Sequence, residues 1–292
     1  MSLKKAVIPI AGLGTRMLPA TKAIPKEMLP IVTKPIIQYV VEEAVNAGFK
    51  EIILVTHSSK TSVENHFDTS FELEVTLEKR VKRALLKEIQ DLSKLNISIH
   101  SVRQGEAKGL GHAILCTKEI LGSDPFAVIL PDMIIKESNK KSNLSLMKAN
   151  YEKYEIPSML LGTAKKEDIE KYGIVTIVNK ERRKNLYSIE SIIEKPKPSE
   201  VSSNQFAAGR YIFNSSIFNF LEKVKKDSLM EIQLTQAIAD YIDSGEMFDG
   251  LKLQGKIYDC GEKLGYIKAI IDFALKDESI NKNLTKFLKE IR

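Results

Sequence analysis

The sequence predicts an α/β fold built around a sheet of parallel strands. Two short apolar runs, residues 6–10 and 52–56, have the length and composition of strands that are buried on both faces. Between them, residues 35–45 place apolar side chains at helical spacing, beginning at Pro35 and ending before Gly48. A strand, a helix and a second strand in this order predict a right-handed crossover between parallel strands.

A glycine-containing loop follows the first apolar run. It has the sequence Ala-Gly-Leu-Gly-Thr-Arg over residues 11–16, and its missing side chains let backbone N–H groups approach an anion. Three cations and three prolines lie in or just behind it: Arg16, Lys22, Lys26, Pro19, Pro25 and Pro30. Each proline fixes φ and removes a donor, so we do not expect the loop to become a helix. The pattern predicts a phosphate-binding loop.

Two commoner glycine loops do not fit these residues. A P-loop needs a second glycine followed by Lys and Ser or Thr, and the spacing here is wrong. A dinucleotide-binding loop needs a third glycine where this chain has Met17. The plain alternative is a turn without a ligand, and the cations and prolines behind the loop argue against it.

Length and composition predict one continuous globular domain. The chain has 292 residues, of which 43% are hydrophobic, and it contains no glycine- or serine-rich linker and no repeat. We divide it into a first half of about residues 1–140, a second half of about 141–262 and C-terminal helices at about 263–292.

Composition also excludes several classes of protein. The net charge of +6 comes from lysines scattered among 38 acidic residues, without the basic and aromatic stripe of a nucleic-acid-binding module. No apolar stretch reaches membrane-spanning length, and the first strand begins too early for a signal peptide, so we expect a cytoplasmic protein. Cys116 and Cys260 lack metal-binding spacing and are interpreted as structural, as are the four histidines; zinc is not expected.

The region after the second strand is predicted to be irregular from residue 58 to 74. From there, one long amphipathic helix is predicted, with apolar residues every three or four positions: Leu77, Val81, Leu85, Ile89 and Leu92. The basic residues between them form either a solvated face or a contact with another subunit, and the sequence does not separate these alternatives.

A third strand, residues 97–102, leads into a loop with one amide side chain and three glycines. Gln104 can hydrogen-bond the edge of a flat ring, and Gly109 lets the backbone pack close to it. We therefore predict that these two residues bind a base. The alternative is a tight turn before a helix at 112–121.

The fourth apolar run, residues 126–130, ends in Pro131-Asp132. A carboxylate at the C-terminal end of a buried parallel strand faces the same crevice as the first loop. Asp132 is therefore a candidate ligand for Mg²⁺, and its alternative role is to cap the next segment.

The second half is predicted to alternate helices with strands, including a hairpin. The expected helices are 144–151, 215–224, 232–244, 263–275 and 279–290, and the expected strands are 158–163, 174–178, 186–193, 206–214, 251–253 and 257–261.

Assembled in order, these motifs resemble the bacterial UTP–glucose-1-phosphate uridylyltransferases, the UDP-glucose pyrophosphorylases. The segments that carry the resemblance are the loop at 12–16, Pro25 to Pro30, Glu64 to Glu72, Gln104 with Lys108 to Ala113, Leu130 to Asp132, Tyr172-Gly173, Glu194 to Pro196, Gly209 to Tyr211, Glu231 to Thr235 and Asp259 to Gly261. The resemblance implies a Rossmann-like nucleotidyltransferase fold with a mixed, mainly parallel sheet flanked by helices. The two halves would then bind nucleotide and sugar.

The resemblance also implies a role for each matching residue. Ala11 and Gly12 would bind the nucleoside, and Glu27, Gln104 and Gly109 would lie around the uracil. Arg16 and Lys26 would bind the UTP phosphates, and Asp132 and Asp259 would bind Mg²⁺. Glucose hydroxyls would meet Gly173 and Glu194, and the sugar phosphate would meet Lys195.

The implied reaction joins UTP and glucose-1-phosphate to give UDP-glucose and pyrophosphate, with Mg²⁺ as cofactor. The resemblance also implies a homo-oligomer, a dimer or tetramer, with no nucleic-acid or membrane partner. Two alternatives remain open. One is a thymidylyltransferase for the same sugar phosphate, because a pocket discriminates one methyl group poorly. The other is a catalytically silent regulatory protein that binds UDP-glucose.

Overall fold

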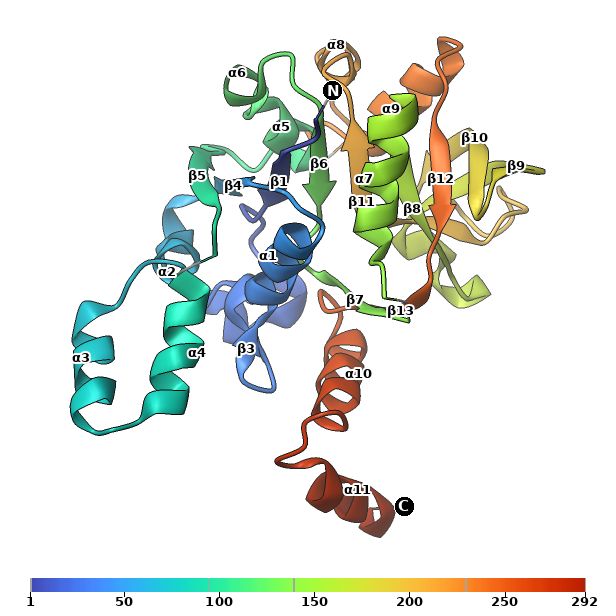
Figure 1. Ribbon diagram of the computed structural model, residues 1–292. Coiled ribbons are helices and arrows are strands. Elements are labelled where there is room, and N and C mark those ends of the chain that lie inside the picture. Colours follow the sequence, from blue (N-terminus) through green and yellow to red (C-terminus); the bar gives the residue numbers. More distant parts are fainter. Residues whose placement is uncertain (1, 94, 139, 229, 292) are drawn as a thin grey trace.

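The computed structural model describes residues 2–93, 95–138, 140–228 and 230–291, and it is organised by a nine-stranded mixed sheet (Figure 1). In their order across the sheet, the strands are β5 (Ser98–Arg103), β4 (Glu51–Thr56), β1 (Lys5–Pro9), β6 (Phe126–Ile129), β11 (Gln205–Phe213), β8 (Ser158–Thr163), β12 (Asp249–Lys252), β10 (Leu186–Glu194) and β9 (Gly173–Arg183). Their pairings make β10 and β11 antiparallel to the other seven. The expected mixed, mainly parallel sheet is confirmed.

The parallel part of the sheet is the part that the sequence predicted most directly. Strands β5, β4, β1 and β6 are mutually parallel, and Val7 of β1 lies between Ile53 and Val128 of its neighbours. Side chains on both faces of β1 are buried, which explains why the strand is apolar without alternation. In the other half, β11 also pairs with β9, so β11, β8, β12, β10 and β9 close into a ring.

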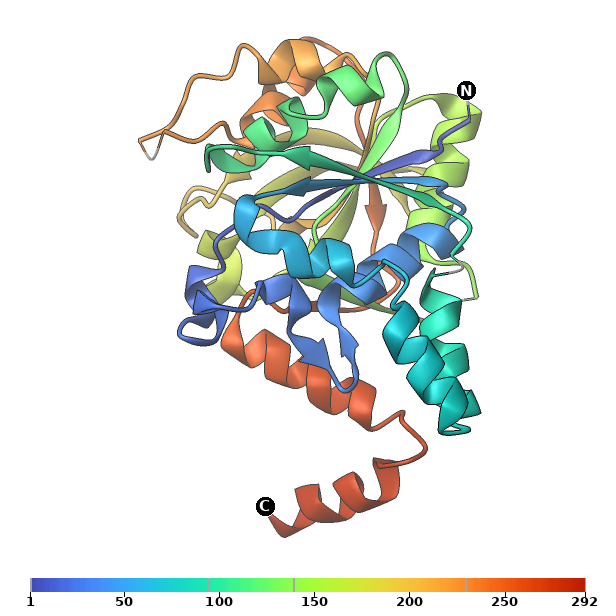
Figure 2. The same ribbon diagram turned by 90° about the vertical axis from the view of Figure 1, so that its left-hand side faces the viewer.

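Helices cover both faces of the sheet (Figure 2). Buried side chains of α1 and α7 pack in one hydrophobic core, and those of α5, α6, α8 and α9 pack in the other. The α-helices are α1 (Ile36–Asn46), α2 (Thr61–Asn65), α3 (Phe71–Lys79), α4 (Arg83–Ser93), α5 (Gly109–Leu115), α6 (Lys118–Leu121), α7 (Asn143–Tyr154), α8 (Ile217–Leu221), α9 (Leu234–Asp243), α10 (Lys263–Ala274) and α11 (Asn281–Glu290). None of the helices in the described ranges is long and apolar enough to cross a bilayer.

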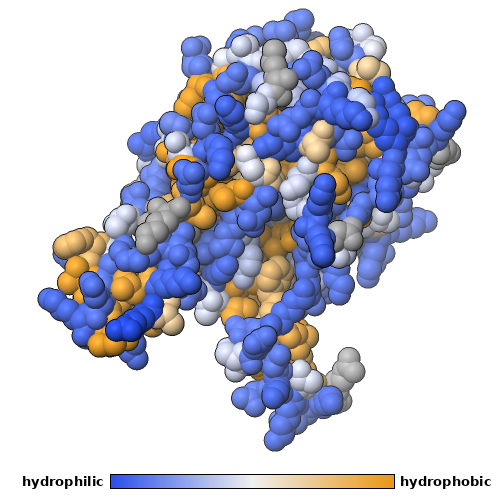
Figure 3. Space-filling model, viewed as in Figure 1, coloured by the Kyte–Doolittle hydropathy of each residue, from blue (hydrophilic) through white to orange (hydrophobic). Residues whose placement is uncertain are grey.

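The prediction for residues 58–92 was wrong in its boundaries. The segment expected to be irregular contains α2 and the first turn of α3, and the expected single helix is divided between α3 and α4. Val81, with φ of 55°, turns the chain between them, so they form a helical arm that projects from the body (Figures 1 and 2). Helix α4 is strongly amphipathic, and the apolar spacing that predicted one helix runs through Leu77, Val81 and Leu85 across the turn. Apolar side chains are visible on the surface of this arm (Figure 3).

A small two-stranded sheet was not predicted from the sequence. Strand β7 (Met133–Glu137) pairs antiparallel with β13 (Gly255–Asp259), and Met133 is opposite Asp259. This small sheet places Asp259 beside the residue that follows Asp132. A further pair, β2 (Pro30–Ile31) and β3 (Lys34–Pro35), was also missed, and the helix expected at 112–121 is α5 and α6.

Glu137, at the end of β7, predicts a pH dependence of stability. Its carboxylate accepts a hydrogen bond from the Asn143 backbone N–H at 3.0 Å, but burial and the nearby charge of Glu43 raise its pKa to about 7. A carboxyl whose pKa is higher in the folded state binds more protons there, so its contribution to the free energy of unfolding falls as pH rises from 4.5 to about 7.

We therefore expect Glu137→Gln to remove this pH dependence. Relative to wild type, the variant should gain about 1–2 kcal/mol of unfolding free energy between pH 5 and pH 8, after allowance for partial solvation. Urea denaturation at the two pH values measures this. If the difference in unfolding free energy between variant and wild type were the same at pH 5 and at pH 8, the raised pKa of Glu137 would be contradicted.

Candidate active site

Two cavities meet at the C-terminal ends of β1 and β6. The first chamber, of about 480 Å³, is lined by the loop after β1 together with Lys26, Gln104 and Gly109. The second chamber, of about 620 Å³, is lined by residues that include Gly173, Glu194 and Lys195. Six residues line both chambers: Thr15, Arg16, Leu110, Leu130, Asp132 and Glu231. The two chambers are therefore neighbouring parts of one crevice.

The first chamber is shaped by glycines at which the backbone comes to the surface. Open space surrounds the position of a side chain at Gly12, and Gly14 has a φ of 67°. At Gly109, a Cβ atom would lie 2.9 Å from the Cβ of Glu231. Two hydrogen bonds, both 2.9 Å long, join the segment around Ile232 to the loop that contains Gly109. The N–H of Ile232 donates to the carbonyl of Lys108, and the N–H of Gly111 donates to the carbonyl of Ile232.

The amide of Gln104 is held in one orientation. Its Nε2 donates to the carbonyl of Gly109 at 3.1 Å and lies 3.0 Å from Nδ1 of His112. The backbone carbonyl can only accept, so Nε2 is the donor, and its second hydrogen is directed to an unprotonated Nδ1. Burial, with the charge of Lys108, lowers the pKa of His112 and favours the neutral ring. Oε1 of Gln104 remains as an acceptor for a ligand.

Two carboxylates meet at the junction of the chambers. A Cβ placed on Gly261 would lie 3.0 Å from Oδ1 of Asp259, 3.1 Å from Oδ2 of Asp132 and 2.8 Å from Nη2 of Arg16. Asp259 is oriented by the N–H of Gly261, at 3.0 Å, and by the hydroxyl of Tyr172, at 3.3 Å. The pairing of β7 with β13 brings these carboxylates together from distant parts of the sequence.

The two carboxylates differ in their electrostatic surroundings. Burial opposes ionisation of Asp132, but Lys26, whose Nζ lies 2.6 Å from Oδ2, and Arg16 outweigh it and lower the pKa. Burial, followed by the charge of Asp132, raises the pKa of Asp259. A divalent cation between the two would favour the ionised form of both.

The donor set at this junction fits Mg²⁺ rather than zinc. Both donors are carboxylate oxygens, and the described residues contain no cluster of three or more His, Cys, Asp and Glu side chains able to hold a metal. Mg²⁺ is typically bound by one or two carboxylates, with phosphate oxygens and water completing the octahedron.

The second chamber begins where β9 and β10 pair. Gly173 is opposite Glu194, and a Cβ at Gly173 would lie 2.8 Å from Cγ2 of Thr235. Lys195 follows Glu194 with a φ of 43°, and its Nζ lies 3.2 Å from the Glu194 carboxylate. A carboxylate and an ammonium group are thus presented side by side to the space above Gly173.

The structure brings all the predicted site residues except one to the walls of this crevice. Those that line it are Ala11, Gly12, Arg16, Lys26, Gln104, Gly109, Asp132, Gly173, Glu194, Lys195 and Asp259. Glu27 lines neither chamber. Its side chain is 1% exposed and lies 2.8 Å from Nζ of the buried Lys60, and burial raises its pKa. The expected contact of Glu27 with the uracil therefore stays a prediction, and in the structure the ion pair with Lys60 holds Glu27 beside Lys26.

Sequence reasoning missed several residues that support the site. Arg210 is fully buried in β11, forms a bidentate pair with Glu43, and donates to the carbonyls of Leu130 and Met133 on either side of Asp132. A lone arginine in an apolar strand was the available signal. Lys60 lay in a segment expected to be irregular and gave no comparable signal.

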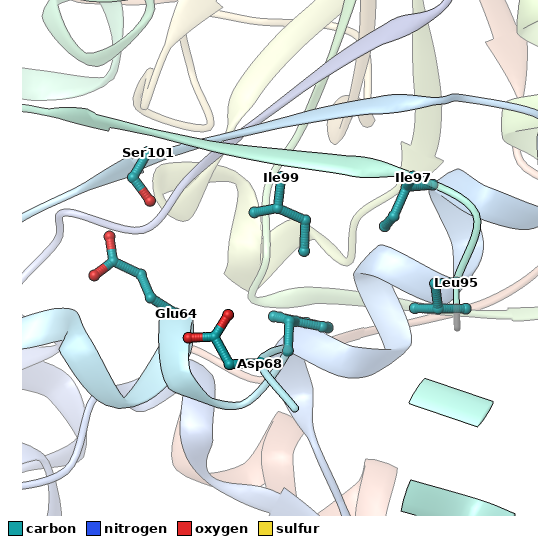
Figure 4. A pocket seen from close by; sticks show the side chains of 7 residues that line it. Glu64, Asp68, Leu95, Ile97, Ile99 and Ser101 are labelled. Carbon is teal, nitrogen blue, oxygen red and sulfur yellow. The ribbon is translucent and has the colours of Figure 1, made fainter. Parts of the chain in front are cut away.

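A third cavity lies apart from the crevice. It has a volume of about 300 Å³ and lies between the α2 region and β5, at the edge of the sheet (Figure 4). Its lining is Glu64, Phe67, Asp68, Leu95, Ile97, Ile99 and Ser101, none of which lines either chamber.

Comparison with known proteins identifies relatives along the whole chain. A family model described as nucleotidyl transferase matches residues 5–276. The chain is 47% identical over 291 residues to a UTP–glucose-1-phosphate uridylyltransferase of Haemophilus influenzae, covering 98% of each chain. It is 46% identical to one from Escherichia coli K12, covering 99% of this chain and 96% of that one.

Two solved structures share the fold over nearly the full length. A UTP-bound UGPase from Acinetobacter baumannii is 41% identical, with a TM-score of 0.91, covering 99% of this chain and all of that one. A UDP-glucose pyrophosphorylase complexed with UDP-glucose is 38% identical, with a TM-score of 0.85, covering 94% of this chain and all of the other.

Proposed function

Because the chain belongs to the nucleotidyl transferase family, we propose that it transfers the uridylyl group of UTP to glucose-1-phosphate, giving UDP-glucose and pyrophosphate. The observation that carries this proposal is the junction of the two chambers, where Arg16 and Lys26 lie with the carboxylates of Asp132 and Asp259. Fixed cations and a site for a divalent cation together can hold two polyanionic reactants that would otherwise repel one another.

The first chamber would bind UTP. Backbone groups of Ala11 and Gly12 would contact the nucleoside, and Arg16 and Lys26 the phosphates. Uracil offers a donor at N3–H and acceptors at its carbonyl oxygens. Oε1 of Gln104 can accept from N3–H, and the backbone at Gly109 can meet a carbonyl edge.

The second chamber would bind glucose-1-phosphate. Gly173 leaves room for the sugar ring, Glu194 would accept hydrogen bonds from glucose hydroxyls, and Lys195 would contact the sugar phosphate. Asp132 and Asp259 would hold Mg²⁺, which would supply positive charge to neutralise the phosphate oxygens.

The reaction requires no nucleophile from the protein. A phosphate oxygen of glucose-1-phosphate attacks the α-phosphorus of UTP in line with the leaving group. The bond from that phosphorus to the bridging oxygen then breaks, and pyrophosphate carries away the electron pair. The protein contributes by aligning the reactants and stabilising charge, as in other phosphoryl transfers.

The cations give a direct prediction. Lys26→Ala and Lys195→Ala should each lower kcat/KM by about 10²–10³-fold, because each removes one donor to a reacting phosphate. Steady-state assays of pyrophosphate release measure this, with Lys140→Ala, an exposed lysine outside both chambers, as the matched control. A change of only a few-fold would place that lysine outside the reacting phosphates.

His112 gives a prediction about the base. Two substitutions of His112 separate hydrogen bonding from packing. Leucine and asparagine side chains have nearly the same shape, but only asparagine can place an acceptor where Nδ1 of His112 lies. In His112→Leu, Gln104 loses one of the two contacts that fix its amide, and the preference for UTP over CTP should fall about fivefold, the value of one hydrogen bond of about 1 kcal/mol. His112→Asn should retain the preference. Equal selectivity in both variants would contradict this.

One assay tests the proposed function against its alternatives. Pyrophosphate release is measured with UTP, dTTP and CTP, each with several sugar-1-phosphates. Fastest turnover of UTP with glucose-1-phosphate supports the proposal. Preference for dTTP would indicate a thymidylyltransferase, and binding of UDP-glucose without turnover would indicate a regulatory protein. We also propose that the chain forms a homo-oligomer.

A further inference from the structure

One carboxylate of the crevice has no part in the reaction as proposed so far. Of the described residues that line the two chambers, four are acidic: Asp132, Glu194, Glu231 and Asp259. Asp132 and Asp259 are the candidate metal ligands, and Glu194 would face the glucose hydroxyls. Glu231 lines both chambers. An additional negative charge opposes the binding of two polyanions, so we expect this carboxylate to contact a hydrogen-bond donor on a substrate.

The backbone of Glu231 is fixed beside the loop that contains Gly109. Its N–H donates to Oδ1 of Asp227 at 2.9 Å, and its carbonyl accepts from the N–H of Asp227 at 3.0 Å. A Cβ at Gly109 would lie 2.9 Å from the Cβ of Glu231. The next residue, Ile232, donates to the carbonyl of Lys108. The start of the Glu231 side chain is therefore held in place on both sides.

The carboxylate of Glu231 is oriented as well. Nε2 of Gln233 donates to Oδ2 of Asp227 at 2.7 Å and to Oε2 of Glu231 at 3.1 Å. An amide nitrogen carries two hydrogens, so both bonds form together, and Oε1 of Glu231 is left for a ligand. Within the described ranges, no group of three or more His, Cys, Asp and Glu side chains could hold a metal, so the ligand of Oε1 is a donor rather than a cation shared with Asp132.

The ribose of UTP would lie next to this carboxylate. In the proposed mode of binding, the base lies at Gln104 and Gly109 and the phosphates lie at Arg16 and Lys26, so the ribose between them follows the wall of the crevice. Glu231 belongs to that wall, because its Cβ is beside Gly109 and its side chain also lines the second chamber. The 2′-hydroxyl is carried by the ribose carbon next to the one that bears the base, which makes it the ribose hydroxyl closest to Gly109.

We propose that Oε1 of Glu231 accepts a hydrogen bond from the 2′-hydroxyl of UTP, and that Glu231 thereby selects ribonucleotides over 2′-deoxyribonucleotides. This inference rests on the proposed function. A site built to hydrogen-bond a hydroxyl rejects an analogue that lacks it, because the polar group of the protein is left without its partner. UTP and dTTP differ in a methyl group and in this hydroxyl, so the ribose contributes directly to the choice between them.

Calorimetric titration with UTP and with 2′-deoxyuridine triphosphate (dUTP), in the presence of Mg²⁺, tests this contact without turnover. The two nucleotides have the same base, so their ratio of dissociation constants reports on the ribose alone. Wild type should bind UTP about 10–100-fold more tightly than dUTP, the value of one hydrogen bond to a charged group. In Glu231→Ala, which keeps the Cβ beside Gly109, this preference should fall to within about threefold of unity.

Two further variants separate recognition of the hydroxyl from a general effect on the site. Glu231→Gln keeps an acceptor without the charge and should retain part of the preference. Glu222→Ala removes an exposed glutamate that pairs with Lys118 and lines neither chamber, and it should retain all of the preference. A residue with a merely structural role would change the affinities for UTP and dUTP alike.

Two results would overturn the proposal: equal affinity of the wild-type protein for UTP and dUTP, or a full preference for UTP in Glu231→Ala. In both cases UTP still binds, and the proposed function stands. A wild-type protein that binds neither nucleotide would instead refute the proposed function, and this inference with it.

Discussion

Asp132→Asn is expected to lower turnover by about 10³-fold or more while the protein remains folded. Asp132 is one of the six residues that line both chambers, and its Oδ2 contacts the Lys26 ammonium at 2.6 Å. Asparagine keeps the size of the side chain but removes the charge that a divalent cation needs from it. Binding of Mg²⁺ and alignment of both substrates are therefore weakened together.

The measurement is the steady-state rate of pyrophosphate release at saturating UTP, glucose-1-phosphate and Mg²⁺. Asp259→Asn should show a loss of similar size, because its carboxylate faces the same point. Asp124→Asn makes the same chemical change at an exposed ion pair with Lys5 and should have little effect. A rate near that of wild type for Asp132→Asn at saturating Mg²⁺ would be incompatible with the proposed metal site.

Sequence patterns predicted the residues that line the first chamber because the determinants of that chamber are local. A strand buried on both faces is apolar at every position, and the loop after it carries glycines and cations within a few residues. Gln104 and Asp132 follow directly from the ends of β5 and β6 for the same reason. Because the carboxyl ends of parallel strands lie at the same edge of a sheet, these residues can be expected to meet there even when no long-range contact is known.

Features that depend on contacts between distant residues were not predictable in this way. The pairing of β7 with β13 joins segments about 120 residues apart. A strand was expected at 257–261, but neither β7 nor the pairing was predicted. The position of Glu27 depends on Lys60, which approaches from another element. For Asp259, Glu194 and Lys195, resemblance to a family supplied what periodicity alone did not.

Arg210→Met is expected to lower the free energy of unfolding by about 3–5 kcal/mol, the cost of leaving a buried charge without its partner. Arg210 has no exposed surface and lies in β11, and it pairs with Glu43 of α1 at 2.8 and 2.7 Å. Its remaining N–H groups donate to the carbonyls of Leu130, Gly209 and Met133. Methionine fills the space but provides no donor.

Urea denaturation measures the loss, and two further variants separate its causes. Glu43→Gln/Arg210→Met removes both charges and should recover part of the stability, because no unpaired charge remains. Arg103→Met makes the same change at an exposed position of β5 and should cost less than about 0.5 kcal/mol. Equal stability of the Arg210→Met and Arg103→Met variants would contradict the role of this ion pair.

The same arginine connects stability to catalysis. Leu130 and Met133 bracket Asp132, so the guanidinium that binds their carbonyls also fixes the position of the Asp132 carboxylate. Arg210→Lys keeps the charge beside Glu43. The lysine ammonium lacks the planar fork of the guanidinium, however, so it cannot reach all of these acceptors. We expect it to retain more stability than Arg210→Met yet still to lower kcat by about tenfold or more, because small displacements of catalytic groups cost up to about 10²-fold. A Lys variant with wild-type kcat would show that the carbonyl contacts do not position Asp132.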